Sequence, residues 1–302
     1  MDKGIFKGYT YLFVTILIFS TMEVVSATLK GLIHPFQLTF IRFFIGGITL
    51  LPLVLIKKEK ILLKDALFIA ALGILNTCVS MGCYQIAVNM GKASTAAIIL
   101  SANPVFVVFL STIILGEKVT RDRILCILLG VLGIILIMYK PDSSSDSFLS
   151  LFLALVGSIT FALYTVLGKK KSDSISSITM ISLSSIFGSA FYIPVLLAMK
   201  LPILYIPQGS IIKILYLGIV LSGISYVTFI EGLKILGAGK GSMVFFLKPG
   251  IVAILAMVFL KEVIDFKAII GMILVIGGVL VNFIYTNRGK IINSNDNKNI
   301  KS

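Results

Sequence analysis

Long apolar runs alternate with short polar connections along almost the whole of the chain. A helix of about 20 apolar residues spans the hydrocarbon core of a bilayer, which is about 30 Å thick. The runs are continuously apolar rather than alternating, so they predict helices and not the strands of a membrane barrel. Breaking them at glycine, proline and charge clusters predicts ten membrane-spanning helices, at residues 8–28, 35–56, 66–87, 94–115, 123–139, 148–167, 178–199, 211–233, 241–260 and 266–285.

The composition agrees with an all-α membrane protein. Apolar residues make up 58% and charged residues 13% of the 302 residues, against about 45–50% and 25% in a soluble domain. The net charge of +14 does not indicate nucleic-acid binding, because most lysines and arginines lie in the connections between apolar runs. Most of them collect on one side of the predicted helices. The positive-inside rule therefore predicts a multi-pass protein of the cytoplasmic (inner) cell membrane with both termini in the cytoplasm.

The second half of the chain repeats the first. A shift of 145 positions brings several residues into register: Gly73 with Gly218, Tyr84 with Phe229, Pro104 with Pro249, and Glu117 with Glu262. Each copy holds five helices, an odd number, so the second copy enters the membrane from the opposite side. We expect inverted five-helix repeats at residues 1–140 and 147–286, and a disordered cytoplasmic tail at 287–302. Secondary transporters use this plan to make one site reachable from either face.

The motifs resemble those of a known family. Arg42 lies early in the second predicted helix, and both copies contain a proline-centred helix that ends in an acidic residue beside lysine, Asn103-Pro104 to Glu117 and Lys248-Pro249 to Glu262. Together with the ten spans and the duplication, these features are similar to the drug/metabolite transporter superfamily, EamA type. The resemblance implies five-helix repeats of that type, a cavity lined by helices 1, 3, 4, 6, 8 and 9, and export or exchange of amino acids, amines, nucleotide-like metabolites or drugs.

Lys248 is the first candidate for binding a solute. It lies near the middle of the ninth predicted helix, where a charge costs about 2.5 to 3.5 kcal/mol on insertion scales. Pro249 follows it, which predicts a bend of the helix with free backbone carbonyls. An ammonium beside such a bend fits an anionic group of a solute. The alternative is that Lys248 reaches the membrane edge or pairs permanently with a carboxylate, which would leave no room for an amino acid.

Glu23 and Arg42 are the second candidates, because they enter the membrane at similar depth on neighbouring helices. One interpretation is a structural ion pair that neutralises both residues. The other is that Glu23 faces the cavity, with Arg42 packed behind it, and binds a proton and a cationic solute group in turn. The sequence leaves both open.

The remaining candidates are uncharged. Polar side chains on the predicted cavity helices that could contact a solute are Asn103, Asn76, Tyr164 and Tyr226. Pro104 and Pro249 predict helix bends at equivalent places in the two copies. Each polar side chain could instead bond one helix to another. Glu117 and Glu262 lie at membrane edges beside lysine, where they are expected to be solvated.

Other chemistry is disfavoured by the residues present. The segment 237–242 lacks the glycine and the strand of a phosphate loop, and the single histidine, His34, can build neither a serine protease nor a histidine metal site. We expect no enzyme activity, cofactor or metal, and the oligomeric state stays open. The function predicted is a secondary transporter, an exporter of small polar metabolites such as amino acids. The alternatives are an exporter of lipophilic cations and a membrane protein with a purely structural role.

Overall fold

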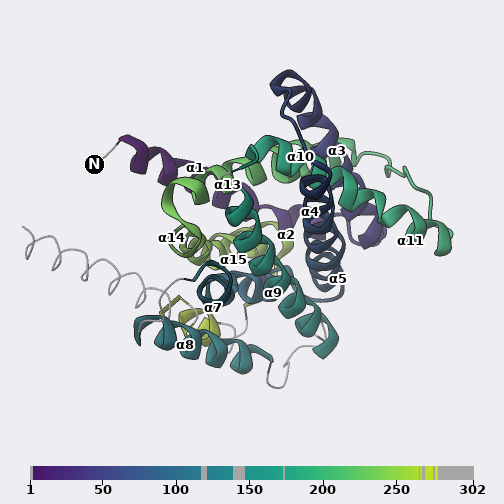
Figure 1. The fold of residues 1–302 in the computed structure, drawn as a ribbon. Helices are drawn as coiled ribbons and strands as arrows, with labels where there is room; N and C mark the ends of the chain where they lie inside the picture. Colours follow the sequence, from purple (N-terminus) through teal and green to yellow (C-terminus); the bar gives the residue numbers. More distant parts are fainter. Residues whose placement is uncertain are drawn as a thin grey trace, which may run out of the picture.

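A computed structural model describes residues 3–116, 121–138, 147–172, 174–264, 266, 269–274 and 276–277. All regular elements of these residues are helical, as predicted, and they pack side by side in one bundle (Figure 1). Within the described ranges, seven helical segments are long and apolar enough to cross a membrane: Gly4–Ala27, Pro35–Lys57, Leu63–Met90, Ala93–Leu115, Phe148–Lys171, Ser177–Ala198 and Ile211–Leu236. Each coincides with a predicted span. The predicted tail, Glu117 and most of the tenth predicted helix lie outside the described residues.

Two further predicted spans form shorter or less regular helices. The fifth is α8 (Arg121–Met138). The ninth is divided into α14 (Ala238–Ser242), the 3-10 turn η3 (Met243–Phe246) and α15 (Leu247–Leu260). The change from 3-10 to α geometry lies just before Lys248 and Pro249. Pro249 lacks the backbone N–H that an uninterrupted α-helix would use there.

Several of the long spans are interrupted near their centres. The first divides into α1 (Lys3–Phe19) and α2 (Met22–Ala27), and the fourth into α6 (Ala93–Ser101) and α7 (Asn103–Leu115), directly before Pro104. The third and eighth spans contain π-helical segments at corresponding places in the two copies. In the third span, η1 (Ile74–Ser80) lies between α4 (Leu63–Gly73) and α5 (Met81–Met90). In the eighth span, η2 (Tyr216–Ile224) lies between α12 (Ile211–Leu215) and α13 (Ser225–Leu236). The seventh divides into α10 (Ser177–Ala190) and α11 (Tyr192–Ala198).

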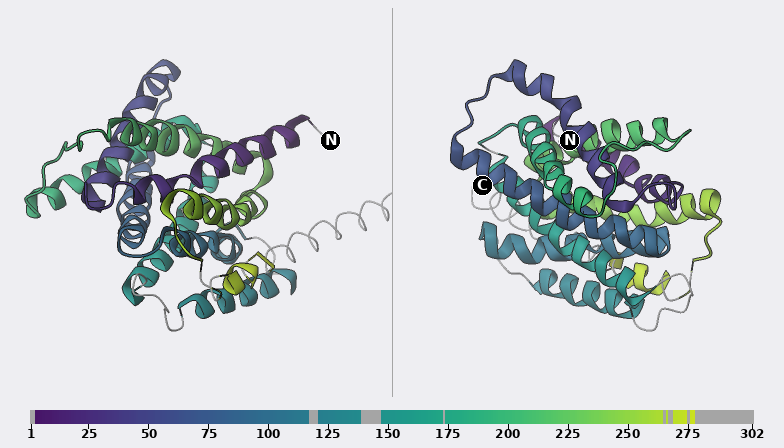
Figure 2. Two further views of the ribbon diagram at one scale, coloured as in Figure 1. Left: turned by 180° about the vertical axis from the view of Figure 1, so that it is seen from behind. Right: turned by 90° about the vertical axis from the view of Figure 1, so that its right-hand side faces the viewer.

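Helices of the first half pack mainly on helices of the second half. α3 (Pro35–Lys57) lies against α10 and η2, α1 lies against α13, and α5 and α7 lie against α9 (Phe148–Lys171). Glycines permit the closest approaches. A Cβ at Gly46 would come within 2.8 Å of the Gly218 carbonyl oxygen, and one at Gly73 would overlap the Ser184 carbonyl in α10. The two further views in Figure 2 show the same interleaving.

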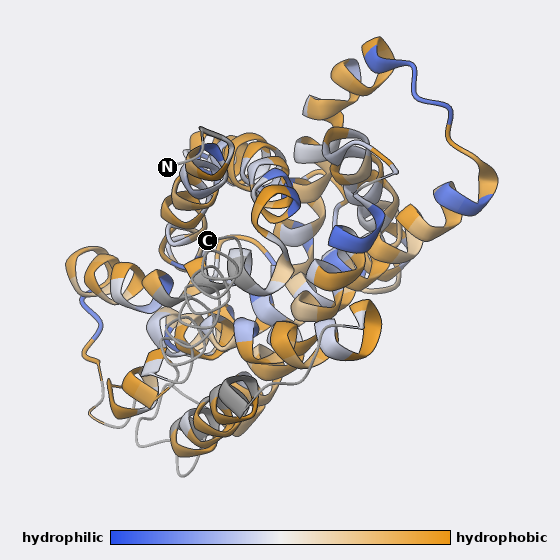
Figure 3. Ribbon diagram, turned by 60° about the vertical axis from the view of Figure 1, so that its left-hand side comes forward, coloured by the Kyte–Doolittle hydropathy of each residue, from blue (hydrophilic) through white to orange (hydrophobic). Residues whose placement is uncertain are grey.

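The outer surface is apolar, as a bilayer requires. Many large apolar side chains that would be buried in a soluble protein are exposed, among them Phe13, Leu55, Ile212 and Phe259. In Figure 3 apolar residues cover most of the helical surface, whereas the polar ones gather at connections and helix ends. An exposed apolar surface of this extent marks a membrane interface. The protein is therefore a multi-pass membrane protein.

Candidate functional site

Three charged side chains of the described residues are buried. Glu23, Arg42 and Lys248 expose 0%, 0% and 1% of their surface. Charges within a membrane-spanning segment are costly and in general face a partner or a solute path. All three residues stand out in the sequence because a charge within an apolar span is costly, and the structure shows how they are arranged.

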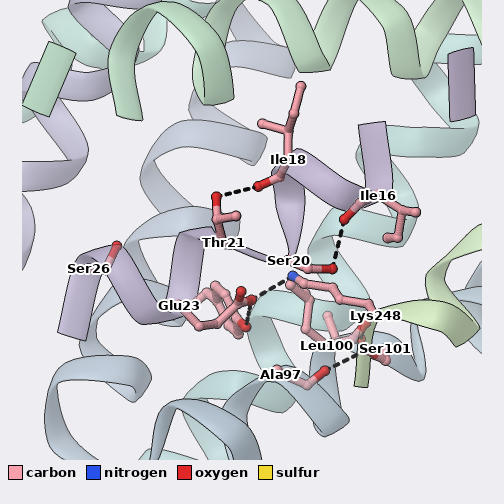
Figure 4. A network of polar contacts seen from close by, with 12 residues as sticks. Ile16, Ile18, Ser20, Thr21, Glu23, Ser26, Ala97, Leu100, Ser101 and Lys248 are labelled. Atoms are coloured by element: carbon pink, nitrogen blue, oxygen red, sulfur yellow. Dashed lines mark hydrogen bonds and ion pairs between the residues drawn. The ribbon is translucent and has the colours of Figure 1, made fainter. Parts of the chain in front are cut away.

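Lys248 and Glu23 form an ion pair that joins the two halves of the chain. The Lys248 Nζ lies 2.6 Å from the Glu23 Oε1, with Lys248 on α15 and Glu23 on α2 (Figure 4). The hydroxyl of Tyr84, on α5, donates a hydrogen bond to the same Oε1. The Lys248 Nζ also lies 5.5 Å from the centre of the Tyr84 ring, within range of a cation–π contact. The second oxygen, Glu23 Oε2, has no hydrogen-bond partner among the described residues.

The interruption of the first span positions Glu23. Ser20 and Thr21 lie between α1 and α2, and their hydroxyls donate to the backbone carbonyls of Ile16 and Ile18, each at 2.7 Å. These bonds satisfy carbonyls at the end of α1 and compete with a continuous helix. Thr21 also hydrogen-bonds the Tyr216 hydroxyl at 2.6 Å, which ties the break to η2. Glu23 then lies in the first turn of α2, directed towards Lys248 (Figure 4).

Arg42 does not pair with Glu23, so the ion pair considered from sequence is replaced by the Lys248–Glu23 pair. Its three guanidinium nitrogens have no hydrogen-bond partner within the described part of the chain. The guanidinium lies 4.7 Å from the centre of the Phe43 ring. Its electrostatic neighbours include Glu23, Lys248 and three tyrosines, Tyr84, Tyr192 and Tyr226. Arg42 is thus a buried cation that has no direct acceptor among the residues the structure describes.

The uncharged candidates occupy different surroundings. The Asn103 side-chain amide donates to the Ser158 carbonyl at 3.2 Å, so it bonds α7 to α9. The Tyr164 ring stacks on Phe161 at 5.9 Å, and its hydroxyl has no partner in the part of the chain described. Asn76 lies in η1 with its side-chain oxygen likewise unpartnered. Asn103, Asn76 and Tyr164 do not line the cavity beside the ion pair.

That cavity is small and mostly aromatic. Its volume is about 10 Å³, which is close to the minimum for one water molecule. The residues that line it are Phe19, Met22, Met81, Leu100, Phe161, Leu221, Tyr226, Phe245 and Lys248. Several of the rings contact one another, Phe19 with Tyr226 at 5.1 Å and Phe161 with Phe245 at 5.7 Å between ring centres. A solute can therefore enter only if the surrounding helices move apart.

A larger groove lies on another side of the same helices. It measures about 440 Å³ and is lined by Thr21, Val24, Val25, Thr28, Ile212, Lys213, Tyr216, Leu255 and Phe259. Its lining is almost entirely apolar, and it includes none of the three buried charges. We therefore place the candidate site at the ion pair and not in the larger groove.

Glu262, which the sequence placed at a solvated helix end, caps a helix of the other half of the chain. Its carboxylate accepts hydrogen bonds from the backbone N–H groups of Ala93 and Ser94, at 2.9 and 3.1 Å, and from the Ser94 hydroxyl at 2.6 Å. These are the first residues of α6, so the second half of the chain caps a helix of the first. The equivalent Glu117 lies outside the described residues.

Sequence reasoning did not give Tyr84 a role in the site. Tyr84 appeared only as the counterpart of Phe229 in the repeat. The sequence offered one signal, which is that Tyr84 carries a hydroxyl and its counterpart Phe229 does not. A hydroxyl within a membrane span indicates a polar partner. Phe19 likewise became relevant only when the cavity lining was known.

Comparison with known proteins agrees with these features. The EamA-like transporter family model matches the chain twice, at residues 6–139 and 148–284. A transporter of uncharacterised function from Clostridium kluyveri is 32% identical, over 92% of this chain and 93% of its own. An S-adenosylmethionine uptake transporter from Rickettsia prowazekii is 26% identical over 64% of this chain and 65% of its own. A solved crystal structure superposes with a TM-score of 0.68, covering 93% of this chain and 98% of its own at 18% identity. The chain belongs to the EamA-like transporter family of the drug/metabolite transporter superfamily.

Proposed function

We propose that this membrane transporter exports small polar metabolites such as amino acids across the cytoplasmic membrane, as a secondary transporter that works by alternating access. Both termini would lie in the cytoplasm, as the distribution of basic residues predicts. The observation that carries the choice of solute is the buried Lys248–Glu23 pair, which joins the two halves of the chain.

An amino acid complements this pair because it carries one charge of each sign. When the pair opens, the solute carboxylate can bind Lys248 and the solute ammonium can bind Glu23. One internal ion pair is then replaced by two between protein and solute, so neither buried charge loses its partner. The unpartnered Glu23 Oε2 supplies a further acceptor for an ammonium.

The size of the cavity requires this exchange to accompany a movement of helices. About 10 Å³ cannot hold an amino acid, and Lys248 is locked against Glu23 at 2.6 Å. If the pair never opened during transport, the amino-acid proposal would fail. The interruptions beside Glu23 and before Pro104 and Lys248 provide places where the helices can bend.

The relative from Rickettsia supports the same solute group. Its name gives S-adenosylmethionine as the transported compound, and that molecule contains an amino-acid carboxylate and ammonium. The shared group is what the Lys248–Glu23 pair would recognise.

A second candidate function rests on the aromatic lining. Rings such as those of Phe19, Phe161 and Tyr226 attract organic cations through their faces. A lipophilic cation could then bind Glu23, while Lys248 moves away. The structure would in that case serve the export of cationic drugs or amines.

One transport assay tests both functions. The purified protein is placed in proteoliposomes, and efflux of labelled amino acids or aromatic cations is measured with and without a pH gradient. We expect amino-acid efflux in the wild type and none in Lys248→Ala, with membrane insertion unchanged. Lys30→Ala, an exposed lysine, is the matched control and keeps its activity. Unchanged efflux in Lys248→Ala, or transport of aromatic cations alone, refutes the amino-acid proposal.

A further inference from the structure

The buried charges of the described residues do not balance. Glu23 contributes one negative charge, whereas Arg42 and Lys248 contribute two positive charges. The tyrosines around them are neutral hydroxyls and cannot supply the missing charge. An unbalanced charge in a low-dielectric interior is strongly unfavourable. The site is therefore prepared for a group that brings one negative charge.

The excess positive charge resides on Arg42. Lys248 already has its carboxylate oxygen at 2.6 Å, and Tyr84 donates to that same atom. The guanidinium, by contrast, has all three nitrogens without hydrogen-bond partners in the described part of the chain, and it is fully buried. A guanidinium binds a carboxylate through two parallel hydrogen bonds, so a carboxylate is the partner that it fits best.

Arg42 lies close enough to the ion pair to interact electrostatically with both of its members. It is about 10 Å along α3 from the helix start, and Glu23 is about 6 Å before the end of α2, so both lie in the same half of the membrane. Glu23, Tyr84 and Tyr226 are electrostatic neighbours of Arg42. Tyr226 also lines the cavity that Lys248 borders.

We propose that the preferred solute is an acidic amino acid, with Arg42 binding the side-chain carboxylate. This rests on the proposed function, in which Lys248 binds the α-carboxylate and Glu23 binds the ammonium. Two carboxylates and one ammonium are the complement of two cations and one anion. Aspartate and glutamate have this charge pattern, whereas neutral amino acids leave Arg42 without a partner.

Glutamate and glutamine provide the matched pair of probes, because they differ in charge and hardly in size. We expect the wild-type protein in proteoliposomes to transport labelled L-glutamate with a kcat/KM about 100-fold above that for L-glutamine, as loss of a buried charged partner implies. Arg42→Gln should remove this preference, and Arg42→Lys should keep part of it. Equal transport of both amino acids by the wild type, or an unchanged ratio in Arg42→Gln, overturns the proposal.

Thermal stability separates this role from a structural one. An unpartnered buried charge destabilises the folded protein, so Arg42→Met should raise Tm while it removes the preference for glutamate. A fall in Tm would show that Arg42 stabilises the fold, and it would contradict the inference. If neutral amino acids are transported in a Lys248-dependent manner without a preference for glutamate, the proposed function stands and this inference fails. If no amino acid is transported, both fail.

Discussion

Replacing the Lys248–Glu23 pair as a unit distinguishes a structural role from a solute-binding role. The two side chains are 1% and 0% exposed, and their charged atoms are 2.6 Å apart. Removal of one partner of a buried pair costs about 3–5 kcal/mol, whereas replacement of both by neutral side chains is neutral or stabilises by about 1–4 kcal/mol. Lys248→Met and Glu23→Gln should each lower the free energy of unfolding by about 3–5 kcal/mol, and the double variant should restore it.

Transport should follow a different pattern. A hydrogen bond to a charged group contributes about 1.5–3 kcal/mol, so loss of both solute contacts lowers kcat/KM by about 100-fold or more. The double variant should therefore be stable but inactive. The control is the Asp65–Lys171 pair, which also joins the two halves at 2.6 Å but is 15% and 25% exposed. Its neutral double variant should keep both stability and transport, because this pair is partly solvated, and solvated pairs contribute about 1 kcal/mol at most.

The measurements are thermal unfolding in detergent and amino-acid efflux from proteoliposomes. A Glu23→Gln/Lys248→Met variant that folds and transports at the wild-type rate would show that the pair serves only the structure. Equal losses of stability in the single and double variants would contradict the assumed energetics of the buried pair.

Three further predictions concern the Glu262 cap on α6, the helix packing and pH. Glu262→Gln should lower the free energy of unfolding by about 1 kcal/mol, because an amide has one acceptor oxygen for the donors of α6; an unchanged Tm contradicts this. Gly73→Ala should cost about 1–3 kcal/mol, since its Cβ would overlap α10, whereas Gly250→Ala has open space and should be neutral or slightly stabilising. The neutral ring of His34 caps α3, and burial lowers the pKa of this ring in the folded state. The cap therefore contributes to stability above pH 6.5, the pKa of an ordinary histidine. This contribution is lost as the pH falls through the lowered pKa of the folded protein. His34→Asn should remove that acid-dependent decrease in Tm; its persistence in the variant would assign it to another group.

The long helices could be predicted because a bilayer imposes a length and an apolar composition on each span. The fifth predicted helix, 123–139, differs from the observed Arg121–Met138 only at its ends. The π-helical segments Ile74–Ser80 and Tyr216–Ile224 could not be predicted. They depend on close contacts with other helices, such as that of Gly46 with Gly218, and these contacts leave no local pattern in the sequence.

The three buried charges could be identified from the sequence, but their pairing, the part played by Tyr84 and the positions of Asn76, Asn103 and Tyr164 away from the cavity could not. Glu23, Arg42 and Lys248 stand out because a charge within an apolar run is costly. Depth along a helix can be counted from the sequence, and this made Glu23 and Arg42 look like partners. The sequence does not show towards which neighbour each helix directs its side chains. This orientation is what places Lys248 beside Glu23.

The origin of the two paired residues bears on how transport is coupled to the solute. Glu23 lies in the first half and Lys248 in the second, so any movement that separates the halves at this depth must also separate the pair. In the repeat, the position equivalent to Lys248 is the uncharged Asn103, and the position equivalent to Glu23 is Thr165. The repeat therefore holds no second ion pair that could replace Lys248–Glu23. Opening without a solute would leave buried charges uncompensated, at a cost of about 3–5 kcal/mol, which would make unloaded opening about 100-fold rarer or more. Under the proposed function, a zwitterionic solute would offset this cost because it would pair with both residues. The pair would then provide a physical reason for the halves to move when a solute is bound and to stay closed otherwise.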